Sequence, residues 1–179
     1  MDKADEVVAQ WLEVARGLLG EGDDRRTLAR ANEAINQAIG LRPELPRAWL
    51  VKCQVMAALG DDVSALAAAE RAVQLAPTSA HAHYWRAAVL GDLGHVRDGL
   101  GAIDRAFLHA GERDAWLLED LYYEKATMLE ALGEREAARA TFEAGLERCP
   151  SSVLLRSGLE PMAAPRAGAT LKLLRGGLT

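Results

Sequence analysis

The sequence predicts an all-α protein in which antiparallel helix pairs stack into a superhelical solenoid. Alanine makes up almost a fifth of the 179 residues and β-branched residues are sparse, a composition that favours helices. Gly60 and Gly94 lie 34 residues apart, and Pro43 and Pro77 are separated by the same interval. Two independent markers with one period indicate an internal repeat.

The last repeat is longer than the others. Gly133 follows Gly94 by 39 residues, and Pro150 follows Pro77 by 73, which is one interval of 34 and one of 39. Both markers therefore report the same five-residue insertion. The insertion is predicted to extend the first helix of the last repeat backwards to an N-cap at Asp114, and a longer loop is the alternative.

Each repeat is predicted to hold two helices, because its apolar residues recur at spacings of three and four. A glycine such as Gly60 ends the first helix, since glycine adopts the left-handed conformation without a side-chain clash. Asp61 and Asp62 follow and can cap the second helix, which stops near Pro77. Ser79 then offers an N-cap for the next repeat.

The clearest repeat runs from Pro46 to Ser79 and carries a recurrent pattern of one Trp, one small residue, a turn Gly, two Ala and a Pro. These residues are Trp49, Cys53, Gly60, Ala65, Ala72 and Pro77. The unit therefore resembles a tetratricopeptide repeat (TPR). Parts of the pattern recur before and after it, so the resemblance covers about residues 9–152 and implies a TPR-like α-α superhelix.

The predicted organisation follows the repeat boundaries. The chain is divided into an irregular N-terminal TPR-like repeat (1–43), two regular repeats (46–79 and 80–113), a repeat with an extended first helix (114–152), a capping helix (153–160) and a basic, apolar tail (161–179). The first repeat is irregular because about four extra residues lengthen its turn between Glu21 and Arg26.

Small side chains are expected wherever two helices cross, since only they let the axes approach closely. Eleven such positions recur in the repeats, and all hold Ala, Gly or Cys: Ala31, Ala38, Cys53, Ala65, Ala72, Ala87, Gly99, Ala106, Ala126, Ala138 and Gly145. Trp49 and Trp11 are predicted to pack in the core slot of the repeat. Trp85 and Trp116 lie off that slot and are predicted to be partly buried, and a half-exposed side chain that is available to a partner is the alternative.

The resemblance also implies a binding groove. In TPR proteins the concave surface is formed by the first helix of each repeat, through positions that share one helical face. On this chain those positions are Leu12, Arg16, Arg47, Leu50, Gln54, His81, Tyr84, Ala88, Asp120, Tyr123, Thr127 and Glu130, together with Ala57 and Gly91.

Four of these positions, Leu12, Leu50, Tyr84 and Tyr123, form an apolar and aromatic ladder. Such a ladder suits an extended peptide or an amphipathic helix with regular apolar anchors. The alternative is that the stripe is simply core. We predict a protein-interaction adaptor or scaffold that binds a peptide or helix of a partner, and a small chaperone resembling those of type III secretion translocators is the alternative function.

No enzymatic function is predicted. The sequence has no Gly-rich phosphate loop, HExxH, paired CxxC or GxSxG motif. His81 and His83 are two residues apart, so their side chains diverge on a helix and do not form a metal pair. Neither a cofactor nor a metal is expected, and Cys53 and Cys149 are expected to be reduced thiols.

The charge distribution argues against nucleic acid as a partner. The chain carries a formal charge of −5, and duplex binding would need clustered Lys and Arg. No apolar run approaches the roughly 18 residues that span a bilayer, and the acidic first ten residues are unlike a secretory signal. A cytoplasmic protein without a membrane partner is expected.

The tail differs from the rest of the chain. Residues 153–179 hold four basic residues and one acid, whereas the remainder has 25 acids and 17 bases. Three interpretations stay open: a disordered end, a segment that docks on its own solenoid or on a neighbouring copy, and a handle for another partner or an anionic membrane. Self-association through the tail or through the solenoid ends is therefore one of the alternatives.

Overall fold

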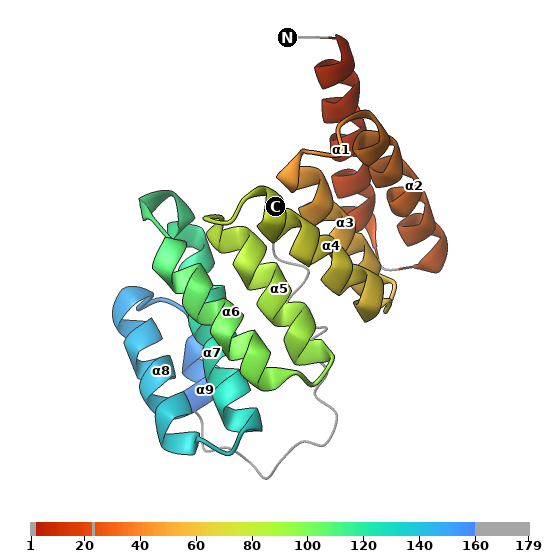
Figure 1. The fold of residues 1–179 in the computed structure, drawn as a ribbon. Coiled ribbons are helices and arrows are strands. Elements are labelled where there is room, and N and C mark those ends of the chain that lie inside the picture. Colours follow the sequence, from red (N-terminus) through yellow and green to blue (C-terminus); the bar gives the residue numbers. More distant parts are fainter. Residues whose placement is uncertain (1–2, 23, 160–179) are drawn as a thin grey trace. The chain divides into compact units, whose positions relative to one another are not determined.

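A computed structural model describes residues 3–22 and 24–159, and every regular element within these residues is a helix (Figure 1). The predicted all-α class is confirmed. The described residues belong to two compact units, one within Met1–Pro77 and the other within Thr78–Leu171. The predicted tail 161–179 lies outside the described residues.

The first unit consists of two helix pairs. The helices α1 (Lys3–Glu21) and α2 (Arg25–Leu41) pack along each other, as do α3 (Pro46–Ala58) and α4 (Asp62–Leu75). In addition, α3 packs against α2 and touches α1, so the second pair stacks on the first. This is the arrangement that a TPR-like array requires, because one pair cannot bury its apolar face alone.

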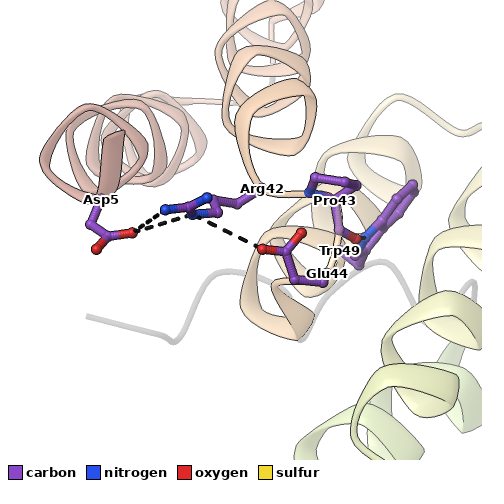
Figure 2. A network of polar contacts seen from close by, with 5 residues as sticks. All are labelled: Asp5, Arg42, Pro43, Glu44 and Trp49. Carbon is purple, nitrogen blue, oxygen red and sulfur yellow. Dashed lines mark hydrogen bonds and ion pairs between the residues drawn. The ribbon is translucent and has the colours of Figure 1, made fainter. Parts of the chain in front are cut away.

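Polar contacts fasten these first three helices together (Figure 2). Arg42, which follows α2, donates from Nε and Nη2 to Asp5 Oδ1 of α1 at 3.3 and 3.2 Å, and its Nε lies 4.0 Å from Glu44 Oε1. The indole Nε1 of Trp49 on α3 donates to the carbonyl oxygen of Pro43 at 2.7 Å. The half-buried Trp49 thus ties α3 to the loop that precedes it.

The second unit holds two helix pairs and a short final helix. Here α5 packs along α6 and α7 along α8, while α9 covers both α7 and α8. The elements are α5 (Ala80–Asp92), α6 (Val96–His109), the 3₁₀ helix η1 (Glu112–Leu117), α7 (Leu118–Ala131), α8 (Arg135–Arg148) and α9 (Val153–Leu159).

The repeat glycines end the first helix of three pairs as predicted. Gly60, Gly94 and Gly133 have φ values of 77°, 79° and 80°, the left-handed region in which a side chain is strained. After each glycine the next amide bonds back into the helix, as Asp61 N does to Met56 O at 2.9 Å. Asp61 then caps α4 by accepting from Ser64 N at 3.0 Å.

The small positions are where the helices meet. All eleven are buried, and so is Ala15 of the irregular first repeat. Gly145 of α8 shows why, because a Cβ built there would lie 2.8 Å from Tyr122 Cβ and 3.0 Å from Leu155 Cδ1. The backbone of α8 therefore approaches α7 more closely than a larger residue would allow.

The five-residue insertion forms η1 and not an additional α-helical turn. Asp114 lies inside η1, where its Oδ2 accepts from Gly111 N at 3.0 Å, and it does not cap α7. The 3₁₀ helix leads directly into α7 at Leu118. This geometry places Trp116 at the edge of α5, since η1 packs against that helix.

Two of the four tryptophans differ from their predicted surroundings. Trp85 is buried, whereas Trp11 is 37% exposed and does not fill a core slot. Among the described helices, none has both the length and the apolar character that a membrane span needs.

Candidate functional site

In the first unit, the apolar residues predicted to line the groove lie in the interior. Leu12 and Leu50 are both buried, whereas Arg16 and Arg47 are exposed and Gln54 is half-buried. The structure therefore offers polar and basic side chains at these positions, and the two leucines contribute to packing.

In α5 the predicted residues are also mostly covered. Tyr84 is 5% exposed and Ala88 is buried, whereas His81 and Gly91 are half-buried. Tyr84 makes an edge contact with Trp85, with ring centroids 5.6 Å apart. The two aromatic residues of this helix thus belong to its packed part.

Four of the predicted residues that reach solvent lie together on one side of α7. Asp120, Tyr123, Thr127 and Glu130 recur at spacings of three and four, so they share one helical face, and each is half-buried. Trp116 of η1 precedes them and is 48% exposed. We call these five residues the η1–α7 stripe.

Trp116 is held in place by α5. Its ring meets the His81 ring edge-on, with centroids 5.2 Å apart. His81 Nε2 in turn accepts a hydrogen bond from Trp85 Nε1 at 2.8 Å, which requires that this nitrogen carry no proton. The exposed tryptophan is therefore fixed from beneath by a histidine that is itself oriented by a buried tryptophan.

Tyr123 is fixed to the interior of the unit. Its ring contacts the Phe142 ring of α8 at 6.0 Å between centroids, and Phe142 forms a core cluster with Ala126 and Leu155. Thr127 donates from Oγ1 to the carbonyl oxygen of Glu124 at 3.0 Å. The middle of the stripe is thus pre-organised, and Tyr123 there is half-buried and not fully covered.

The acids of the stripe are incompletely hydrated. Burial, together with the charge of Glu119, raises the pKa of Asp120 from 3.8 to about 6. Burial also raises the pKa of Glu130, although Arg135 opposes this shift. The pKa of Tyr123 is raised by burial and by Glu124 and Glu130. A cation or hydrogen-bond donor placed here would replace hydration that the fold has removed.

Four of the five stripe residues belong to the groove predicted from the sequence, whereas for Trp116 a contact with a partner was only the alternative to a packing role. Its position off the repeat's core slot was the available signal, and the insertion concealed its register. Within the described residues, no group of three or more His, Cys, Asp or Glu side chains is arranged to hold a metal ion.

Comparisons with known proteins agree with this architecture. No protein-family model and no curated protein sequence matches the chain. Solved structures do match: MamA has a TM-score of 0.65 at 17% identity, covering 89% of this chain and 81% of its own. PilF of Pseudomonas aeruginosa has a TM-score of 0.75 at 12% identity, covering 88% and 68%.

A third match, YrrB, is described as "a TPR protein with an unusual peptide-binding site". It has a TM-score of 0.64 at 16% identity and covers 74% of this chain and 66% of its own. These likenesses establish the fold. The chain has the TPR fold of antiparallel helix pairs, as the residues of its repeats predicted.

Proposed function

We propose that this chain is a protein-interaction scaffold that binds a peptide or helical segment of a partner. The observation that carries the proposal is the η1–α7 stripe, in which a half-buried tyrosine and two acids share one face of α7 and an exposed tryptophan precedes them on η1. Aromatic side chains supply contact area at little conformational-entropy cost, and acids supply orientation.

The chemistry of the stripe specifies the partner segment. Trp116 and Tyr123 would receive apolar side chains, while Asp120 and Glu130 would receive Lys, Arg or other donors. Asp120 and Glu130 are ten residues apart on α7, which corresponds to about 15 Å along the axis. A helical segment of about ten residues, or about five residues of extended chain, spans that length.

The other members of the predicted groove have different roles in this proposal. Leu12, Leu50 and Tyr84 are buried and are not proposed to touch the partner. Arg16, Arg47 and Gln54 are accessible and remain proposed contacts within the first unit. His81 supports the stripe from α5 through its contact with Trp116, and Ala88 is buried in the same helix.

The TPR fold adds a supporting argument, because YrrB is a TPR protein described as having a peptide-binding site. We propose no catalytic activity for this chain. Its cytoplasmic location stays a prediction from composition.

A selection from a random peptide library tests the proposal. Immobilised wild-type protein should enrich peptides in which Lys or Arg flanks a large apolar residue. Asp120→Asn combined with Tyr123→Ala should weaken binding of those peptides at least about tenfold, since a hot-spot aromatic and a charge are lost together.

The chain provides matched controls for both substitutions. Tyr122 is also half-buried, but it lies on another face of α7, where its ring contacts the Phe107 ring of α6 at 4.9 Å between centroids. The control double variant combines Tyr122→Ala with Glu143→Gln on α8. It removes one tyrosine ring and one carboxylate outside the stripe and should leave the affinity for the selected peptides unchanged. Equal loss in both double variants, or no enrichment at all, would refute the proposed site.

A further inference from the structure

The outer face of the first helix pair has an unusual composition. Val7, Trp11 and Val14 of α1 are all exposed large hydrophobic residues, and their spacings of four and three place them on one side of the helix. In repeat proteins, a face that no neighbouring repeat covers is normally polar.

A cavity of about 390 Å³ lies along this face. Its apolar wall is formed by Trp11, Val14 and Leu18 of α1, and Ala34 of α2 contributes to it. Its lining comes from α1 and α2, whereas α3 packs against α2 and touches α1 elsewhere. The cavity therefore belongs to the side of the pair on which no further described helix of this unit is stacked.

The charged rim of the cavity is self-complementary. Arg30 and Glu33 of α2 both line it, both are exposed, and their spacing of three places them on one face of the helix. In a two-fold symmetric interface, if residue i contacts residue j, then j also contacts i. A two-fold axis that passes between these two positions brings each arginine opposite the glutamate of the other copy.

We propose that a second copy of this chain covers the outer face of α1 and α2, forming a two-fold symmetric dimer. Trp11 and Val14 of each copy pack against the apolar wall of the other. Arg30 pairs with the partner's Glu33, and the reciprocal pair forms on the other side of the axis. This surface shares no residue with the η1–α7 stripe, so the two proposals can fail separately.

Sedimentation equilibrium on the full-length chain tests the dimer. The wild type should be dimeric at micromolar concentrations, and Trp11→Glu should be monomeric with unchanged helical circular dichroism and unchanged peptide binding. Val14→Glu provides a second disruption should Trp11→Glu fail to fold. A monomeric wild type would overturn the proposal, as would a dimer that both variants retain.

The reciprocal charges allow a sharper test. Arg30→Glu alone and Glu33→Arg alone should each weaken the dimer at least about tenfold, because each places like charges opposite one another twice. An equimolar mixture of the two variants should restore dimerisation, since every contact across the axis is then again between opposite charges. Failure of the mixture to associate would refute the two-fold arrangement.

Hydroxyl-radical footprinting of Trp11 distinguishes a second copy from another segment of the same chain as the group that covers this face. Trp11 should be protected in the dimer and oxidised in the Val14→Glu monomer. Protection of Trp11 in a monomeric wild type would assign the face to another segment of the same chain and would overturn the dimer.

Discussion

Replacing Gly145 with alanine tests the close contact between α7 and α8. The new Cβ would lie 2.8 Å from Tyr122 Cβ and 3.0 Å from both Tyr122 Cγ and Leu155 Cδ1. The first of these atoms is fixed to the backbone of α7 and cannot rotate away. The substitution therefore forces the two helices apart.

The size of the effect follows from two opposing terms. Overpacking a well-packed contact costs about 1–3 kcal/mol. Alanine recovers about 1 kcal/mol of helix propensity relative to glycine. Gly101 of α6 isolates the second term, because a Cβ there meets nothing within 4 Å. We expect Gly101→Ala to be more stable than Gly145→Ala by about 1–3 kcal/mol.

Urea unfolding followed by circular dichroism measures both variants in the same unit of the structure. Gly101→Ala should be at least as stable as the wild type, and Gly145→Ala should have a lower midpoint with an unchanged slope. Equal stabilisation by both substitutions would show that α7 and α8 do not approach as closely as described.

Three further substitutions have defined outcomes. Ser152→Ala should lower the free energy of unfolding by about 1–2 kcal/mol, since Ser152 Oγ accepts from Leu155 N at 2.9 Å and caps α9. Ser151 is its exposed neighbour, and Ser151→Ala should leave the stability in urea unfolding nearly unchanged. Asp120→Asn should stabilise the fold relative to the wild type, because the folded state favours the protonated form of Asp120. The gain in free energy of unfolding should grow as the pH rises from 3.8 to about 6 and should be constant above that. A difference in unfolding midpoints that does not change with pH would contradict the raised pKa. Trp49→Phe should cost about 1 kcal/mol by thermal unfolding, because it removes the indole hydrogen bond, and an unchanged stability would count against that bond.

Much of the fold could be predicted because its signals are local or periodic. The 34-residue interval located the turns, since a glycine such as Gly60 in the left-handed region and a cap such as Asp61 act within a few residues. The small positions were predictable for a related reason, because a close helix crossing excludes large side chains wherever it recurs. Gly145 is an example.

The candidate site was predicted less completely because helical spacing specifies a shared face but not what covers it. Tyr84 and Tyr123 occupy equivalent repeat positions, yet Tyr84 is buried and Tyr123 is half-buried. Trp11 and Trp116 are both exposed, although Trp11 was predicted in a core slot and Trp116 was predicted to be partly buried. Their exposure depends on the open outer face of the first pair and on the 3₁₀ geometry of η1, and neither follows from the repeat pattern.

Chemical-shift mapping by nuclear magnetic resonance tests the binding surface most directly. A peptide from the library selection would be titrated into isotope-labelled full-length protein. The account predicts that the largest shifts occur at the Trp116 indole N–H and at the amides of α7 between Asp120 and Glu130. Largest shifts on the outer face of α8, with the Trp116 indole unmoved, would contradict it.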